Sequence, residues 1–297
     1  MGISEILGLL GGLALFLHGM QMMSSGLEAA AGARMKSILE RLTANRFLGV
    51  LVGAAITAVI QSSSATTVMV VGFVNAGMMT LGQAVWIIMG ANIGTTVTGL
   101  LIALDVGELA PMFAFVGVVL MVFIKEPKLQ HIGQILAGLG VLFIGMGMMS
   151  SSMSPLRDSE PFIRIMSTFS NPLLGILAGA AFTAVIQSSS ASVGILQALA
   201  SSGVISYASS VFVLFGQNIG TCITAVLAAI GTNRNAKRAT LIHLMFNLIG
   251  TAIFTTLFVL FPIAAVVEGT LVLPGEVGRT LSHLIPTDPV AQIAMTH

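Results

Sequence analysis

Leu48–Ala65 of this 297-residue chain reads LGVLVGAAITAVIQSSSA, and Leu174–Ala191 reads LGILAGAAFTAVIQSSSA. Fifteen of the eighteen positions are identical, and the two stretches lie 126 positions apart. The same offset relates Gly90–Thr98 (GANIGTTVT) to Gly216–Thr224 (GQNIGTCIT). The chain therefore contains an internal duplication, and each copy places a run of polar residues directly after apolar sequence.

The composition indicates a membrane protein. Apolar residues make up 56% of the chain, charged residues only 8%, and the mean hydropathy is +1.01; a soluble domain carries roughly a quarter charged residues. The net charge of +1 provides no basic surface for nucleic acid. The single cysteine, Cys222, excludes an internal disulfide, and we interpret it as a small buried residue.

Five apolar stretches are long enough to cross a bilayer as helices, which takes roughly 20 residues. They lie at about residues 3–23, 81–104, 129–150, 206–230 and 240–262. A shorter apolar stretch lies at about 110–124. The first stretch lacks a basic start and a small-residue cleavage site, so we interpret it as a retained span.

Segments 47–77 and 173–203 have a different pattern, with Gln-Ser-Ser-Ser between two apolar limbs of about 13 residues each. At 1.5 Å per residue, one limb reaches roughly the middle of a hydrocarbon core about 30 Å thick. We therefore predict two re-entrant helical hairpins with tips at Gln61–Ser64 and Gln187–Ser190, the second helix of each beginning after the serines. The alternative is one long tilted helix per segment, with its serines packed against a neighbouring helix.

The predicted fold is an all-α polytopic membrane protein with two inverted repeats, because hairpins that do not cross leave three crossings in the first repeat. We expect residues 1–128 to form the first repeat, 129–262 the second, and 263–297 a non-cytoplasmic loop leading to a further span. We also expect a charged helix, Glu28–Arg46, on the cytoplasmic face.

Basic residues orient the ends of the chain. The side with more of them is predicted to be cytoplasmic, and it carries Arg34, Lys36, Arg41, Arg46, Lys125, Lys128, Arg234, Lys237 and Arg238, against Arg157, Arg164 and Arg279 on the other side. A chain in which both hairpin segments cross the bilayer also gives nine basic residues against three. Charge therefore does not distinguish a hairpin from a span.

Neutral polar groups are the candidates for binding a ligand, because no Asp, Glu, Lys or Arg falls at the centre of a predicted span. A carboxylate proton relay is therefore not expected. The candidates are the two Gln-Ser-Ser-Ser blocks, Asn92, Asn218, Thr95 and Thr221. Helix N-termini at the tips would add free N–H groups for a small tetrahedral oxyanion. Carbonyls freed at the ends of the first limbs, together with hydroxyl oxygens, suit a sodium ion.

Other residues have plainer interpretations. His18 and Gln21 have no counterparts in the second repeat, so we interpret them as a local polar packing pair. His243 and Asn247 lie one turn apart, and we expect interhelical hydrogen bonding from them rather than metal binding. Close helix packing is the plain role of the glycines that flank Asn92 and Asn218, which are Gly90, Gly94, Gly216 and Gly220. The paired placement of an amide beside each hairpin favours a shared site over packing alone.

The paired Gln-Ser-Ser-Ser blocks, each followed by G-x-N-I-G-T, resemble the type II sodium–phosphate cotransporters, and their short bacterial branch in particular. The motif A-x-x-x-H-x-x-F-N, from Ala239 to Asn247, adds to a resemblance that covers about residues 10–262. It implies a symporter of sodium and inorganic phosphate, with no enzymatic activity and no cofactor besides sodium as co-substrate. It further implies a multi-pass protein of the bacterial inner membrane, either a monomer or a homodimer.

The resemblance also implies the binding residues. Phosphate would be held by Gln61, Ser62, Ser63, Ser64, Asn92, Gln187, Ser188, Ser189, Ser190 and Asn218. Sodium would be held by Ser64, Thr66, Asn92, Thr95, Ser190, Asn218 and Thr221.

The chain departs from the family pattern in two places. Pro111–Gly117 (PMFAFVG) lacks the H-D-x-F-N motif of some relatives, which leaves the sodium stoichiometry and electrogenicity open. Bacterial relatives usually continue beyond the position of His297 with another span, and often with a cytosolic PhoU-like regulatory region. We therefore expect the chain to be part of a longer protein.

Three alternatives remain open. The first is a hairpin transporter of another small anion, such as sulfate or a carboxylate. The second is a phosphate-sensing membrane protein that does not transport. The third is an intramembrane serine hydrolase using Ser62 or Ser188 with His243, although the chain has no G-x-S-x-G elbow.

Overall fold

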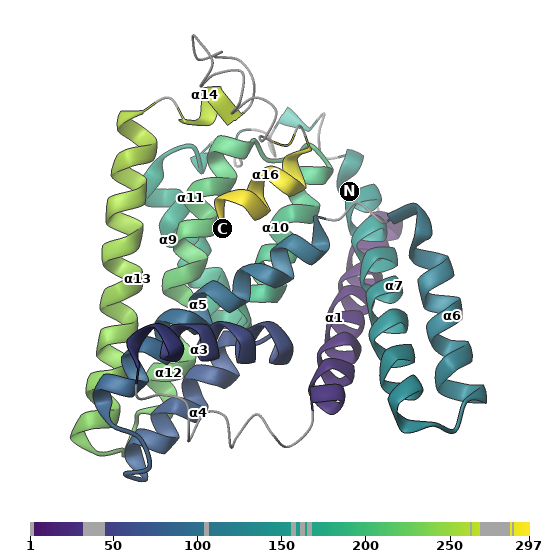
Figure 1. Cartoon of the computed structure of the whole chain (residues 1–297). Coiled ribbons are helices and arrows are strands. Elements are labelled where there is room, and N and C mark those ends of the chain that lie inside the picture. Colours follow the sequence, from purple (N-terminus) through teal and green to yellow (C-terminus); the bar gives the residue numbers. More distant parts are fainter. Residues whose placement is uncertain are drawn as a thin grey trace, which may run out of the picture.

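A computed structural model of the chain describes residues 3–31, 45–103, 107–155, 159–160, 164, 168–261, 263–267, 286 and 288–297. Every regular element in these ranges is a helix (Figure 1). Most of the predicted cytoplasmic helix Glu28–Arg46, including Arg34, Lys36 and Arg41, lies outside them. Much of the predicted loop 263–297, including Arg279, and Arg157 also lie outside the described residues.

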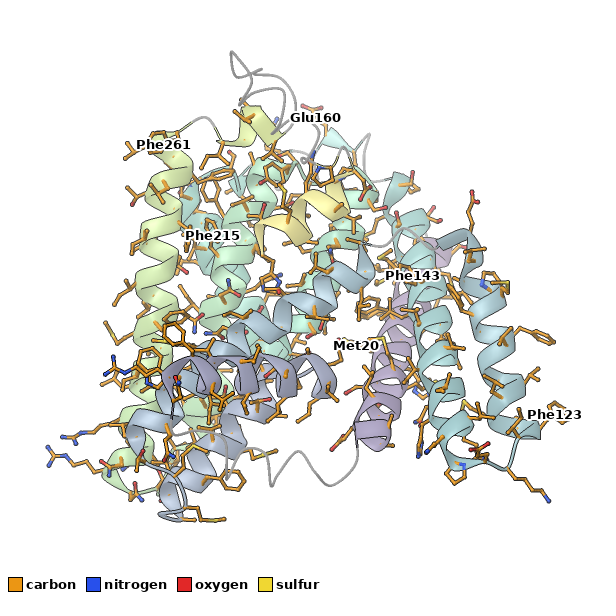
Figure 2. The ribbon with its side chains drawn as sticks, viewed as in Figure 1. Met20, Phe123, Phe143, Glu160, Phe215 and Phe261 are labelled. Carbon is orange, nitrogen blue, oxygen red and sulfur yellow. The ribbon has the colours of Figure 1, made fainter. Side chains whose placement is uncertain are left out.

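Five apolar helices confirm the prediction of a multi-pass membrane protein. They are long and apolar enough to cross a bilayer, and they comprise α1 (Ile3–Ala31), α5 (Leu81–Ile102), α7 (Pro127–Met153), α13 (Arg234–Leu260), and α11 (Tyr207–Gly220) with its continuation α12 (Cys222–Ala228). The shorter stretch forms α6 (Ala110–Phe123), preceded by the 3₁₀ turn η1 (Gly107–Leu109). Figure 2 shows Phe123 and Phe261 pointing away from the molecule, as suits side chains that face lipid.

Each predicted hairpin segment consists of two helices. The first contains α3 (Arg46–Ile60) and α4 (Ser63–Asn75), and the second contains α9 (Pro172–Ile186) and α10 (Ser189–Ser201). The chain leaves helical geometry at Gln61–Ser62 and again at Gln187–Ser188. The alternative of one unbroken helix per segment is therefore wrong, and both breaks fall at the predicted tips.

Glycines let the first helix of each pair lie directly on the long helix that follows. A Cβ atom on Gly90 of α5 would overlap the carbonyl oxygen of Val50 in α3, and one on Gly216 of α11 would overlap the carbonyl oxygen of Ile176 in α9. Small residues are what allows two helix backbones to approach this closely in a membrane protein. Close packing, the plain role of these glycines, is therefore observed at Gly90 and Gly216.

The broken helices lie between a group of three helices at one side of the molecule and the long helix α13 at the other (Figure 1). Helix α7 packs between α1 and α6 at one side, and α13 lies at the other. Within the predicted loop 263–297, the chain forms α14 (Ile263–Val267) and α16 (Pro289–Thr296). Helix α16 packs against α5, α10 and α11. This arrangement brings the two helix breaks and α1 together near the centre.

Candidate functional site

The two tip glutamines have an unusual backbone conformation. Gln61 (φ 58°, ψ 24°) and Gln187 (φ 60°, ψ 19°) are left-handed, and no other non-glycine residue in the described part of the chain has positive φ. The left-handed region costs a residue with a Cβ atom about 1–2 kcal/mol. Strained backbone of this kind concentrates at functional sites, so the duplicated strain marks both tips as candidates.

The first serine of each block begins the following helix. The Ser62 hydroxyl oxygen accepts a hydrogen bond from the Ala65 N–H at 3.1 Å, and that of Ser188 accepts from the Ala191 N–H at 3.3 Å. Both serines are N-caps in extended conformation, a position for which serine is among the preferred residues. The expectation that the second helix begins after the serines is therefore wrong. The last two serines of each block instead lie in the first turn of that helix.

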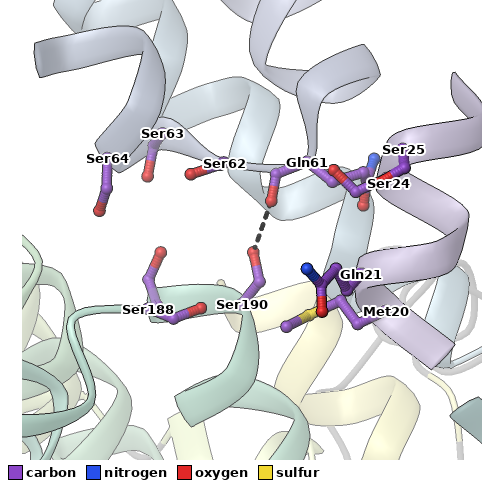
Figure 3. A pocket seen from close by; sticks show the side chains of 11 residues that line it. Met20, Gln21, Ser24, Ser25, Gln61, Ser62, Ser63, Ser64, Ser188 and Ser190 are labelled. Atoms are coloured by element: carbon purple, nitrogen blue, oxygen red, sulfur yellow. Dashed lines mark hydrogen bonds between the residues drawn. The ribbon is translucent and has the colours of Figure 1, made fainter. Parts of the chain in front are cut away.

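The tips of the two repeats meet through hydrogen bonds. The Ser190 hydroxyl donates to the Gln61 carbonyl oxygen at 3.3 Å (Figure 3). The same hydroxyl also lies within hydrogen-bonding distance of Thr98 Oγ1, at 3.4 Å. Thr98 Oγ1 in turn donates to Gln61 Oε1 at 2.7 Å. Residues 129 positions apart in the chain are thereby joined, and three buried side chains from α5, α10 and the first tip form one network.

A cavity of about 170 Å³ opens between the tips. Its described lining is polar apart from one methionine and contains no charged side chain; the residues are Met20, Gln21, Ser24, Ser25, Gln61, Ser62, Ser63, Ser64, Ser188, Ser189 and Ser190. Figure 3 shows the first tip and the second tip on opposite sides, with α1 alongside them. The cavity can therefore offer hydroxyl, amide and helix N-terminal N–H groups to a small ligand.

Helix α1 contributes residues that the sequence analysis did not assign to the site. Gln21, Ser24 and Ser25 line the cavity, and the Ser24 hydroxyl donates to the Ile60 carbonyl oxygen at 2.5 Å, at the end of α3. His18 is exposed, so the interpretation of His18 and Gln21 as a packing pair is wrong. A signal was present, because Gln21 and Ser24 share one face of an apolar helix.

The predicted binding residues fall into four groups. Seven of them line the cavity between the tips: Gln61, Ser62, Ser63, Ser64, Ser188, Ser189 and Ser190. Gln187 is exposed and is not part of that lining. Asn92 and Asn218 line a second cavity of about 840 Å³, bounded mainly by α5, α11 and α13. Thr66, Thr95 and Thr221 are buried and line neither cavity.

The three buried threonines differ in their partners. Thr66 Oγ1 accepts from Thr57 Oγ1 at 3.0 Å and donates to the Ser62 carbonyl oxygen at 3.1 Å. Thr221 Oγ1 donates to the Gln217 carbonyl oxygen at 2.9 Å. Thr95 Oγ1 is buried without a hydrogen-bond partner. Each hydroxyl oxygen keeps a lone pair free for a further interaction.

His243 and Asn247 act within the helix packing. The Asn247 amide donates to the His243 carbonyl oxygen at 2.9 Å and approaches Cys222 Sγ on α12 at 3.4 Å. The expected interhelical contact is thus present, and Cys222 is buried as predicted. Neither His243 nor any carboxylate is among the described residues that line the cavity of Ser62 and Ser188, so the arrangement gives these serines no base.

Comparison with known proteins identifies the family of the chain. The pattern of the Na⁺/Pi-cotransporter family matches residues 15–151 and 158–272. The chain belongs to the Na⁺/Pi-cotransporter family. Members of this family are transporters rather than enzymes, and sodium is their co-substrate. No solved structure matches the chain.

Bacterial and animal proteins are similar to this Na⁺/Pi-cotransporter family member. The putative inorganic phosphate export protein YjbB of Escherichia coli K12 is 29% identical over 249 residues, covering 84% of this chain and 46% of that protein. The uncharacterized protein YqeW of Bacillus subtilis is 32% identical over 243 residues, covering 80% and 78%. Human sodium-dependent phosphate transport protein 2B is 36% identical over 110 residues, covering 36% and 16%. The chain thus spans about half the length of YjbB.

Proposed function

We propose that this protein is a sodium-coupled symporter of inorganic phosphate, with phosphate bound in the cavity between the two tips. The observation that carries the proposal is the junction of both Gln-Ser-Ser-Ser tips around one polar, uncharged cavity. Membership of the Na⁺/Pi-cotransporter family supports the same substrate and the same co-substrate.

The cavity suits an oxyanion although no Lys or Arg is among its described lining residues. Helices α4 and α10 begin at the tips, and the free N–H groups and positive dipole end of a helix N-terminus favour an anion. Serine hydroxyls and the glutamine amide add hydrogen-bond donors. The phosphate ligands we propose are the tip residues from Gln61 to Ser64 and from Gln187 to Ser190, together with Asn92 and Asn218, which line the second cavity.

Sodium supplies the positive charge that the described lining of the cavity lacks. A phosphate anion and a sodium ion held near each other in a dry site stabilise one another. The hydroxyl and amide oxygens we propose for sodium are those of Ser64, Thr66, Asn92, Thr95, Ser190, Asn218 and Thr221. In support, the side-chain oxygens of Ser64 and Thr95 are buried and lack hydrogen-bond partners.

The architecture we propose has two inverted repeats whose hairpins enter the membrane and turn back at the tips. The helix breaks at equivalent glutamines support this architecture, as does the limb length of 15 and 13 residues in each pair. Irregular backbone within the membrane is tolerated where it lines a cavity, which is where both breaks lie.

Phosphate export is a second candidate function, because the relative YjbB is named a putative export protein. The same site can serve either direction, since a symporter follows the sum of the sodium and phosphate gradients. An inward sodium gradient drives uptake by a coupled symporter, whereas a sodium-independent exporter does not respond to it.

The deciding experiment measures radiolabelled phosphate uptake into proteoliposomes that contain the purified protein. We expect accumulation with an inward sodium gradient, none when choline replaces sodium, and little inhibition by excess sulfate or succinate. Accumulation driven by a proton gradient without sodium would contradict the proposal. Phosphate binding without gradient-driven accumulation would favour a phosphate sensor.

A further inference from the structure

In the described part of the second repeat, five buried side-chain oxygens have no hydrogen-bond partner. Three of them belong to adjoining helices and are Thr183 Oγ1 on α9, Ser192 Oγ on α10 and Gln217 Oε1 on α11; the other two are Gln197 Oε1 and Thr255 Oγ1. The three side chains are 0%, 0% and 1% exposed, respectively. Buried polar atoms are nearly always hydrogen-bonded, so three unpartnered oxygens in one region need an explanation.

The three oxygens belong to side chains at one meeting point of helices. The Gln217 amide nitrogen donates to the Ser192 carbonyl oxygen at 3.0 Å. A Cβ atom on Gly220, one turn beyond Gln217, would lie 2.8 Å from Cβ of Thr183. Thr183 and Ser192 therefore both adjoin the same turn of α11. The hydrogen bond to Ser192 fixes the Gln217 amide nitrogen as a donor. The amide oxygen is left without a partner and is free to bind a cation.

The first repeat does not have this arrangement at the equivalent positions, which are Thr57, Thr66 and Ala91. Thr57 Oγ1 donates to Thr66 Oγ1 at 3.0 Å, so these hydroxyls satisfy each other. Ala91 has no side-chain oxygen at all. The second repeat thus leaves its two hydroxyls without the mutual hydrogen bond and adds an amide oxygen beside them.

We propose that Thr183, Ser192 and Gln217 form a sodium site that is present in the second repeat only. Neutral oxygen ligands suit a hard cation, and the absence of a carboxylate among these three favours a monovalent ion over calcium or magnesium. This inference rests on the proposed sodium-coupled function and adds a ligand set outside the tip cavity.

The position of the site suggests how sodium acts on phosphate. The Ser192 N–H donates to the Ser188 carbonyl oxygen at 3.1 Å, within the first turn of α10. The same turn carries Ser190, which bonds the first tip. A sodium ion held between α9, α10 and α11 fixes the start of α10 and thereby the donors that face phosphate. Sodium and phosphate then strengthen each other's binding by the same factor.

The test uses sodium-dependent thermal stabilisation of the detergent-purified protein, measured without phosphate and with choline as the replacement ion. We expect Thr183→Val, Ser192→Ala and Gln217→Leu each to raise the half-maximal sodium concentration at least about tenfold, the loss typical of one contact to a charged group. Thr183→Ser and Ser192→Thr keep the oxygen and should retain the parental response. Thr240→Val is the matched control, because its buried hydroxyl already has two carbonyl partners.

The outcomes separate the site from the transport function. Parental sodium responses in all three oxygen-deleting variants would overturn the site while leaving sodium-driven uptake intact. If the parent shows a sodium response that these variants lose, but shows no phosphate uptake, the site stands and the transport proposal fails. If Thr183→Val does not fold, the comparison of Ser192→Ala with Ser192→Thr decides the matter.

Discussion

At the scale of single residues, the duplicated glutamines have identical local structure and different surroundings. Gln61 and Gln187 share the left-handed backbone conformation within a few degrees. Gln61 is buried and its side-chain oxygen accepts from Thr98, whereas Gln187 is exposed. The two tips are therefore not equivalent in this conformation, although their sequences are the same.

The first prediction concerns phosphate affinity. Gln61→Ala removes an amide from the tip cavity and leaves Thr98 without its acceptor. A lost hydrogen bond to a charged group costs about 1.5–3 kcal/mol, so phosphate affinity should fall roughly tenfold to a hundredfold. Gln187→Ala should weaken binding less, since that side chain does not line the cavity. Equilibrium binding of radiolabelled phosphate checks both, and parental affinity in Gln61→Ala would contradict the assignment.

The second prediction concerns coupling. Thr95→Val and Thr221→Val keep the shape of the side chain and remove its oxygen. We expect the sodium concentration for half-maximal uptake to rise about tenfold in each variant, with the preference for phosphate over sulfate unchanged. Uptake measured over a sodium titration, with and without sulfate, tests this. A change of anion preference without a change in sodium dependence would place these threonines at the anion instead.

At the scale of elements, the close pairs α3–α5 and α9–α11 position the tips. Carbonyl oxygens of Val50 and Ile176 occupy the space where Gly90 and Gly216 lack a side chain. These are backbone contacts, which cannot move aside as the end of a flexible side chain can. The orientation of each tip relative to the cavity therefore depends on glycine at these positions.

The third prediction follows from that contact. Gly90→Ala should destabilise the protein by about 1–3 kcal/mol through overpacking and lower its Tm by roughly 3–10 °C. Gly72→Ala is the matched control, because no atom lies within 4 Å of a Cβ atom placed there. The control should be neutral or slightly stabilising. Thermal unfolding of both variants in detergent checks the prediction, and equal Tm values would contradict it.

At the scale of the whole molecule, the topology depends on whether each broken helix pair turns back within the membrane or crosses it, and the distribution of charge does not distinguish these two arrangements. The chain suits cysteine labelling because its single cysteine, Cys222, is buried. Phe47 and Met78 lie at the two ends of the first predicted hairpin and are 86% and 54% exposed. Leu173 and Ser201 lie near the two ends of the second predicted hairpin, and both are exposed.

The fourth prediction uses these positions. With a membrane-impermeant thiol reagent, Phe47→Cys and Met78→Cys should both react from the cytoplasmic side only, whereas Leu173→Cys and Ser201→Cys should both react from the opposite side only. The parent chain should remain unlabelled. Labelling of Phe47→Cys and Met78→Cys from opposite sides would show that the first segment crosses the membrane, and the inverted architecture would then be wrong.

Much of the fold follows from local sequence. About 20 apolar residues in a row predict a spanning helix because backbone hydrogen bonds must be satisfied inside the helix in lipid. Four consecutive polar residues between two apolar limbs, each too short to span the membrane, predicted the breaks at Gln61 and Gln187. The duplication, the membrane class, the five apolar helices and the two tips were therefore determined by the sequence itself.

The assembly of the site depended on tertiary structure. No local rule indicates that Ser190 bonds the Gln61 carbonyl, or that Asn92 and Asn218 line a different cavity. The spacing of Gln21 and Ser24 indicates a polar face on α1, but only the packing of the helices places that face at the tip cavity. Nor does the duplicated sequence distinguish the tip glutamines, one of which is buried and one exposed. Contacts between distant segments arise from how the helices pack, and identical motifs acquire different partners because each faces a different neighbouring helix.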